Sequence, residues 1–333
     1  MSATSVNPSI QPLIYLAPMS GVTNQAYRKI VKSFASDVLY PEFVSVDGMH
    51  FGSAKSAELL RFDDTERPIK AQLFGANPEY FFEATKRVKE LGFDGVDINF
   101  GCPAPKVAKN GGGCALLGDL GLCRDVIQAT LDAAGPDFPV SVKTRMSYRE
   151  VHVRDFCKKI EDLPLAQIAI HGRPFEKPYL GAANLDCIKE AKGLVPFPVM
   201  ASGHAHTPEA ARHTLEYTGA DGMAVARGTF GKPWLIMQIK QYLETGTYWI
   251  PTQIEILETM LKHARLANQM KTERPFMEIR KVLGWYVRDI PHAASYRAQL
   301  MQVNTFAEIE LIVEKIRRDL HASPVWQVPA NVS

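Results

Sequence analysis

The chain has 333 residues, of which 46% are hydrophobic and 22% are charged, a composition typical of a globular protein. Its 38 Lys and Arg residues nearly balance 36 Asp and Glu residues, giving a formal net charge of +2. This balance excludes the uniformly basic surface of a protein that coats DNA, so we expect no DNA partner and at most a local nucleic-acid-binding patch.

The N-terminal segment and the cysteines indicate the cellular compartment. Residues 1–12 contain neither the basic nor the apolar region of a signal peptide, and the chain has no run of 18 apolar residues. The five cysteines are odd in number and include no CxxC pair, which argues against a disulfide framework and a zinc ribbon. We therefore expect a cytoplasmic protein with reduced thiols and no membrane contact.

Short apolar runs rich in branched residues recur from the N-terminus onward, and amphipathic segments separate most of them. This alternation is typical of a parallel α/β sheet, and eight such units in about 230 residues match a (β/α)8 TIM barrel. A doubly wound sheet would have fewer strands and a GxGxxG opening, which is missing here. The predicted strands are 13–19, 38–46, 69–75, 94–100, 139–145, 166–172, 197–203 and 220–228.

The last part of the chain has a different pattern. After Trp234 the strand pattern ends, and residues 252–321 contain only helical periodicity. Gly and Pro turn signals lie between the two regions. We therefore predict a barrel domain, residues 1–250, and an all-helical domain, residues 251–333.

The predicted strands carry polar or special residues at their carboxyl ends, the edge where barrels place their chemistry. These residues are Pro18, Met19, Glu42, Gln72, Asn99, Lys143, Arg145, His171, Ser202 and Arg227. Lys143, Arg145 and His171 end two successive strands and favour an anionic or electron-rich ligand. A lysine there would stabilise negative charge on a reduced aromatic cofactor, and a histidine would hydrogen-bond a ring carbonyl.

Two short segments follow the seventh and eighth strands, where barrels commonly bind a phosphate through loop amides and a short helix. Their residues are Ser202, Gly203, Ala226, Arg227 and Gly228. The Arg227 guanidinium would add a fork of donors, so we expect a ligand that carries a phosphate. His204 and His206 form an HxH pair, but no carboxylate or cysteine stands at a suitable spacing, and no metal site is predicted.

A long loop, residues 99–117, follows the fourth strand and contains three consecutive glycines, which allow the backbone to approach a ligand closely. Cys102 lies just past the strand end between Gly101 and Pro103, in a position that we expect to be accessible. A thiol there can act as a proton donor or as a nucleophile, depending on its pKa. Cys114 precedes an apolar run and is expected to pack beneath the loop.

The motifs LAPMSGVTN, AQLFG, DGVDINFGCPAPKV, SVKTR, IHGR and VARGTFGKPW occur in the order and spacing of the tRNA-dihydrouridine synthases, and the resemblance covers nearly the whole chain. The segment EIRKVLGWYVRDIP resembles the bacterial B-type branch. The resemblance implies that FMN lies over the carboxyl rim, that NADPH reduces it, and that the helical domain binds tRNA. A target uridine would turn out of its stack and receive hydride at C6 and a proton at C5.

The resemblance also assigns roles to individual residues. Cys102 would be the catalytic acid, and Asn99 and Arg145 would hold the uridine. The expected flavin-binding residues are Pro18, Met19, Gln72, Lys143, His171, Ser202, Gly203, Ala226, Arg227 and Gly228. Ser202 stands where the family usually has Asn, and Ala226 where Gly is common; both departures concern flavin affinity rather than the reaction.

The helical domain has only a small excess of basic residues, but these lie close to aromatic residues in the sequence. Such a pattern of cations and aromatics suits structured RNA. The predicted tRNA contacts are Arg280, Lys281 and Arg288, within a group that also contains Arg274, Trp285, Tyr286, Tyr296 and Arg297. The alternative is that the aromatics form the core of the helical bundle. We expect the chain to act as a monomer.

Three other functions are compatible with the same pattern. The first is an FMN-dependent reductase of a free small molecule, similar to dihydroorotate dehydrogenase, which leaves the helical domain unexplained. The second is a lyase in which Lys143 forms a Schiff base with a phosphorylated carbonyl compound. The third is an inactive RNA-binding relative, which the presence of Cys102, Lys143 and His171 disfavours.

Overall fold

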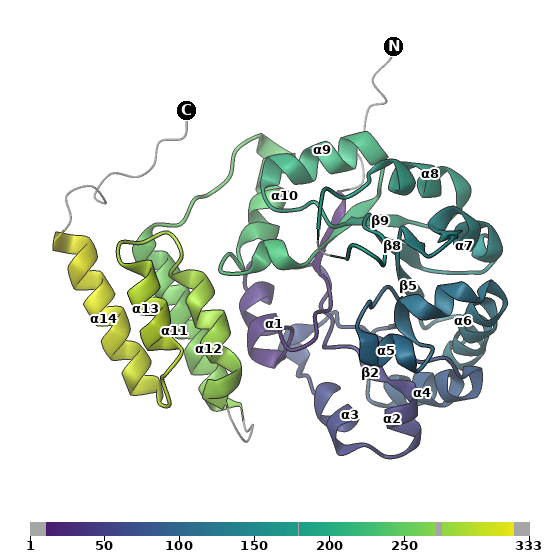
Figure 1. Ribbon diagram of the computed structural model, residues 1–333, viewed down its shortest axis with the longest axis horizontal. Helices are drawn as coiled ribbons and strands as arrows, with labels where there is room; N and C mark the ends of the chain where they lie inside the picture. The colour runs from purple at the N-terminus through teal and green to yellow at the C-terminus, as the bar shows by residue number, and fades with distance from the viewer. Residues whose placement is uncertain (1–10, 179, 271–274, 323–333) are drawn as a thin grey trace, which may run out of the picture.

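A computed structural model describes residues 11–178, 180–270 and 275–322 of the chain. Within this described part, eight parallel strands form one curled sheet with helices outside it, and helices α11 to α14 form a separate group beside the barrel (Figure 1). The predicted TIM barrel followed by a helical unit is therefore confirmed. The sheet order is β1-β10-β9-β8-β5-β4-β3-β2.

The strands agree with the predicted positions but are shorter. Their bounds are β1 Leu13–Leu16, β2 Val44–Ser45, β3 Ala71–Phe74, β4 Val96–Phe100, β5 Val140–Arg145, β8 Gln167–His171, β9 Val199–Ser202 and β10 Gly222–Val225. A two-stranded hairpin, β6 Ser147–Tyr148 with β7 Val151–His152, follows β5 and was not predicted, because strands of two residues have no readable periodicity.

The prediction of a long second strand at residues 38–46 was wrong. Only a single parallel bridge between Leu39 and Ile69 and the two residues of β2 belong to the sheet. Pro41 interrupts this segment, and a proline has no N–H for the ladder. Side chains help to close the barrel here: Asp37 Oδ2 accepts a hydrogen bond from Ile14 N at 2.7 Å, and Ser36 Oγ accepts one from Leu16 N at 3.1 Å.

The helices begin and end at residues whose chemistry explains the boundary. Asn77 caps the barrel helix α4 by accepting a hydrogen bond from Glu79 N, and Pro78 occupies its first turn. Thr207 caps α9, which ends at Gly219 in the left-handed conformation. The barrel helices are α1 Gln25–Lys32, α2 Val46–His50, α3 Ala54–Leu59, α4 Pro78–Glu90, α5 Pro105–Lys109, α6 Leu120–Ala134, α7 Val153–Ile160, α8 Asp186–Leu194, α9 Pro208–Thr218 and α10 Leu235–Thr245.

The second unit consists of α11 Gln253–Gln269, α12 Pro275–Tyr286, α13 Ala293–Leu300 and α14 Phe306–Ala322. It packs against the barrel through aromatic side chains. The Trp285 indole stacks on Phe230 with ring centroids 3.9 Å apart, and its edge approaches Tyr27 of α1. Gly231 is needed beneath it, because a Cβ there would lie 2.2 Å from the Trp285 carbonyl oxygen.

The same packing bears on whether the aromatic residues of the helical unit contact RNA or form its core. Tyr286 and Tyr296 are buried, and Trp285 is half-buried in the contact with the barrel. This burial favours the interpretation that these three residues belong to the core and the interface.

In the described parts of the chain, no helix combines the length and the apolar character needed to cross a bilayer.

Candidate active site

The loop after β4 is held at its start by one side chain. Asn99 Oδ1 accepts hydrogen bonds from the backbone N–H groups of Gly101 and Cys102, each at 2.9 Å, which turns the chain sharply at the strand end. The loop returns at Cys114, whose N–H donates to the Cys102 carbonyl oxygen at 3.1 Å. Cys102 is therefore fixed at the barrel rim, and with 9% of its surface exposed it is buried rather than accessible as expected, because the returning loop packs against it.

Two of the loop glycines are required by close packing. Gly113 has a positive φ of 61°, and a Cβ there would lie 2.8 Å from the Cys102 carbonyl oxygen. A Cβ at Gly112 would lie 3.3 Å from the backbone of Gly75. These glycines bring the loop back against Cys102 and the end of β3. Cys114 is fully buried beneath the loop, as predicted.

The surroundings of the Cys102 thiol shift its pKa. Burial raises its pKa, and the neighbouring Ala104 amide, Arg145 and Lys143 only partly oppose that effect. A thiol with a raised pKa keeps its proton at neutral pH. Of the two roles left open by the sequence, the structure therefore favours proton donor over nucleophile.

Hydrogen-bonded register between adjacent strands brings the predicted rim residues together. Asn99 on β4 pairs with Lys143 on β5, Arg145 pairs with His171 on β8, and His171 pairs with Ser202 on β9. Gln72 on β3 accepts a hydrogen bond from Asn99 Nδ2 at 2.8 Å through its own Oε1. Pro18 and Met19 lie half-buried just after β1, which pairs with β10.

His171 is surrounded by cations. Arg145 donates from Nη1 to His171 Nδ1 at 2.8 Å, and Arg173 Nη1 lies 3.3 Å from His171 Nε2. Burial, together with the charges of Lys143, Arg145, Arg173 and Arg227, lowers the pKa of His171 to about 2. Burial, together with Arg145, lowers the pKa of Lys143 to about 8. The rim is therefore a site of positive potential that contains a neutral histidine.

The predicted phosphate residues line a small cavity of about 30 Å³ at the ends of β9 and β10. Gly228 closes it on one side, because a Cβ there would lie 2.1 Å from the Ala205 carbonyl oxygen. The lining includes His171, Ser202, Gly203, Ala226, Arg227 and Gly228. Arg173 supports this region by donating to the Gly203 carbonyl oxygen at 2.7 Å. Arg173 was not among the predicted site residues, although the IHGR motif contains it.

The three predicted tRNA contacts on or after α12 lie in different environments. Arg280 donates to the Val303 carbonyl oxygen at 2.8 Å and to Asn304 Oδ1 at 2.6 Å, within the helical unit. Lys281 Nζ lies over the rim loop, 3.3 Å from the position that a Cβ on Gly21 would take. Arg288 is exposed. Arg274 falls outside the described residues.

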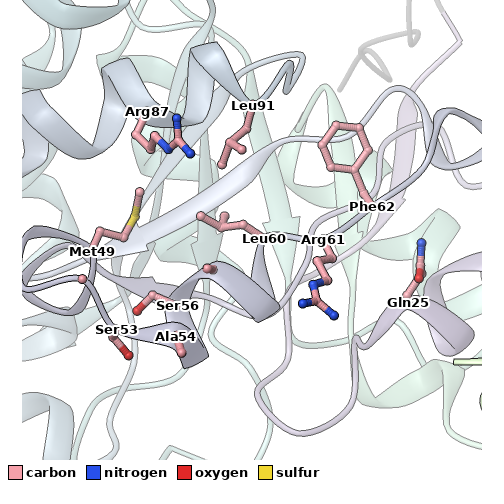
Figure 2. A pocket seen from close by; sticks show the side chains of 12 residues that line it. Gln25, Met49, Ser53, Ala54, Ser56, Leu60, Arg61, Phe62, Arg87 and Leu91 are labelled. Atoms are coloured by element: carbon pink, nitrogen blue, oxygen red, sulfur yellow. The ribbon is translucent and has the colours of Figure 1, made fainter. Parts of the chain in front are cut away.

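A larger cavity, about 590 Å³, lies apart from the predicted site (Figure 2). Ser53, Ala54 and Ser56 line one side, Arg87 of α4 and the C-cap residue Leu91 line the other, and Leu60 lies between them. Its lining contains none of the predicted catalytic or flavin-binding residues. Size alone therefore does not identify the functional site; the converging rim side chains do.

The curled parallel sheet with helices outside it defines a TIM-barrel protein with a basic carboxyl rim. Its fold is similar to that of the old yellow enzyme homologue from Zymomonas mobilis, with a TM-score of 0.51 and 14% identity over 73% of this chain and 91% of that one. The dihydrouridine synthase family model matches residues 15–321.

Named relatives give the same result. The chain is 34% identical over 296 residues to the probable tRNA-dihydrouridine synthase 1 of Synechocystis sp., covering 88% of this chain and 82% of the relative. It is 34% identical over 305 residues to tRNA-dihydrouridine synthase B of Shewanella oneidensis, covering 90% and 94%. The chain belongs to the dihydrouridine synthase family and is an oxidoreductase of that type.

Proposed function

We propose that this protein reduces the C5–C6 double bond of specific uridines in tRNA to 5,6-dihydrouridine, with FMN as its cofactor and NADPH as the reductant. The observation that carries the proposal is the position of the Cys102 thiol just after β4, next to the basic ends of β5 and β8, where burial raises its pKa. Saturating a pyrimidine requires a proton donor on one side and stabilisation of negative charge on the other.

The residues present fit the phosphate and the ring of FMN. Arg227 lowers the pKa values of His171, Arg173 and His206 through charge repulsion, in each case together with burial. A bound phosphate dianion would offset that repulsion. Ser202, Gly203, Ala226, Arg227 and Gly228 would hold the phosphate, and Pro18, Met19, Gln72, Lys143 and His171 would contact the ring region. Bound FMN supplies hydride chemistry that the side chains themselves lack.

Each rim side chain has a defined task in this proposal. Lys143 stabilises negative charge at the edge of the cofactor ring. Neutral His171 would lie against a carbonyl oxygen of the cofactor ring, with Arg145 on its Nδ1 and Arg173 on its Nε2. Cys102 donates its proton to C5 while hydride arrives at C6, which balances the addition of two hydrogens. Asn99 and Arg145 position the uridine, although Asn99 also holds the loop.

tRNA is the proposed partner, and the protein acts on it as a cytoplasmic monomer. Lys281 supports a composite binding surface, because it projects from α12 over the rim loop at Gly21. Arg288 adds an exposed cation on the same unit. A uridine turned out of its stack would then reach Cys102 while the rest of the tRNA contacts the helices.

The test is reduction of tRNA lacking dihydrouridine by purified protein with FMN and NADPH. Mass spectrometry of the digested tRNA is expected to show uridines that gain two hydrogens, at positions that sequencing of the fragments identifies. Free uridine and orotate, both of which carry a C5–C6 double bond, are the matched substrates for a small-molecule reductase. Rapid turnover of either one without tRNA, together with unmodified tRNA, would overturn the proposal.

A further inference from the structure

Asp97 is a buried carboxylate in the barrel interior that neither the sequence motifs nor the comparisons assign to a task. It lies on β4 with 2% of its surface exposed. Its Oδ2 accepts a hydrogen bond from Gln72 Nε2 at 2.6 Å, and its Oδ1 accepts one from Ser141 Oγ at 2.7 Å. Burying a charged group costs free energy, so its presence here requires a reason.

The hydrogen bonds continue from Asp97 to the loop. Gln72 donates to Asp97 and accepts from Asn99 Nδ2, and Asn99 Oδ1 in turn accepts from the N–H groups of Gly101 and Cys102. Gln72 is 1% exposed and Asn99 is 7% exposed, so water has little access to this chain of amides. Two side-chain amides therefore connect Asp97 to the backbone of Cys102.

The two ends of this chain fix its direction. A backbone N–H can only donate, so Gly101 and Cys102 require the oxygen of Asn99, which leaves its Nδ2 to donate to Gln72 Oε1. Gln72 Nε2 must then face an acceptor. An ionised carboxylate offers only acceptors. Burial raises the pKa of Asp97, and the hydrogen bonds from Gln72 and Ser141 and the charges of Lys143 and Lys70 partly oppose that effect.

We propose that Asp97 is a positioning residue whose acceptor oxygen sets the orientation of the Gln72 and Asn99 amides and thereby holds the Cys102 loop at the rim. The link to catalysis rests on the proposed role of Cys102 as the acid. Reversing the two amides would place Asn99 Nδ2 against two backbone N–H donors, which would release the start of the loop.

Substitutions at Asp97 separate orientation from charge. Asp97→Asn can keep an oxygen toward Gln72, because Ser141 Oγ can accept from the new Nδ2 while donating to the Val96 carbonyl oxygen, 3.3 Å away. Asp97→Leu removes the acceptor at similar volume. Ser141→Ala alone leaves the carboxylate unchanged toward Gln72. In the double variant, Asp97→Asn with Ser141→Ala, the Ser141 hydroxyl no longer helps to select the orientation of the new amide.

The readout is the rate at which iodoacetamide alkylates Cys102 in the FMN-loaded protein, measured by peptide mapping, with Cys187 on α8 as the internal reference. We expect Asp97→Asn and Ser141→Ala, each alone, to be alkylated at Cys102 at a rate within about twofold of the parent protein. The double variant and Asp97→Leu are expected to be alkylated more than about fivefold faster at Cys102 alone, with kcat for tRNA lowered about tenfold or more.

Two results would overturn the proposal. The first is an alkylation rate of Cys102 in the double variant that equals the sum of two small single-variant effects. The second is an equal increase of that rate in Asp97→Asn and Asp97→Leu, which would show that the charge of Asp97 matters rather than its acceptor oxygen. If Asp97→Leu does not fold, Asp97→Asn, Ser141→Ala and the double variant still test the proposal. Because alkylation needs no tRNA turnover, failure of the acid assignment for Cys102 would show in the activity of Cys102→Ala and leave this readout intact.

Discussion

The barrel rim and helix α12 both present cations that the sequence predicts to bind an anion, yet the two regions use them differently. At the rim, Lys143, Arg145 and Arg227 act on the same half-buried imidazole of His171 and depress its pKa. On α12, the Arg280 guanidinium donates to two acceptors of the α13–α14 connection. Residue type therefore does not determine the role of a cation; the groups that its side chain contacts do.

The largest effect is expected at the proton donor of the rim. Cys102→Ala should lower kcat for dihydrouridine formation by a factor of about 10² to 10⁴, because the product needs a proton at C5 and the alanine methyl group cannot supply one. Flavin absorbance should persist, since the thiol is not part of the phosphate site. The matched control is Cys114→Ala, a second buried thiol under the same loop.

Steady-state rates and the visible spectrum of both variants decide this prediction. Unchanged turnover in Cys102→Ala would remove the acid from the mechanism, whatever the behaviour of the control. A loss of bound flavin in Cys102→Ala would instead indicate that the loop supports the cofactor.

Arg227 is the next strongest test of the convergent rim. Arg227→Gln should weaken FMN binding about 10- to 100-fold, because a charged hydrogen bond to phosphate is worth roughly 1.5 to 3 kcal/mol. Riboflavin, which has no phosphate, should bind the variant and the parent equally. Arg154→Gln on the outer helix α7 is the control for a lost surface charge. Equal weakening of FMN and riboflavin would place Arg227 away from the phosphate.

Lys143 should set the alkaline limit of activity. Its pKa is lowered to about 8, so the ammonium is present below that pH and is lost as the pH rises through it. Because burial raises the pKa of Cys102, the lysine is the group expected to titrate first, and kcat should fall about fivefold between pH 8 and pH 9. In Lys143→Arg the cation persists, and the alkaline limb should move upward by more than one pH unit. An identical pH profile in both proteins would exclude Lys143 as the titrating group.

The sequence predicted the barrel because strand periodicity and strand-end residues are local features. It overestimated the second strand, since the run 38–46 is apolar but contains Pro41, and only the three-dimensional pairing showed that Asp37 and Ser36 side chains help to close the barrel there. The hairpin β6–β7 was missed for a related reason: two-residue strands are defined by pairing, not by composition.

The site was predictable to the same extent. Motif positions located Cys102, Lys143 and His171 at the rim, because parallel strands align their carboxyl ends. Asp97 was missed because its side chain lies inside the barrel, and its importance depends on which amides it faces. Arg280 could not be distinguished from Arg288 by sequence, since both are basic residues near aromatics and only their contacts differ.

The smallest effect separates those two arginines. Arg288→Gln should weaken tRNA binding about two- to threefold and reduce the salt dependence of log Kd by roughly 0.7 to 0.9, because one phosphate contact releases less than one counterion. Arg280→Gln should leave that slope unchanged and lower the free energy of unfolding by about 1 to 2 kcal/mol, since two hydrogen bonds to residues 303–304 are lost. Filter binding from 50 to 200 mM salt and urea unfolding measure the two quantities. A reduced salt slope in Arg280→Gln with unchanged stability would show that Arg280 exchanges its intramolecular contacts for a phosphate when tRNA binds. The rim and α12 would then differ in whether their cations already have protein partners before the anion binds, and not in whether they bind an anion.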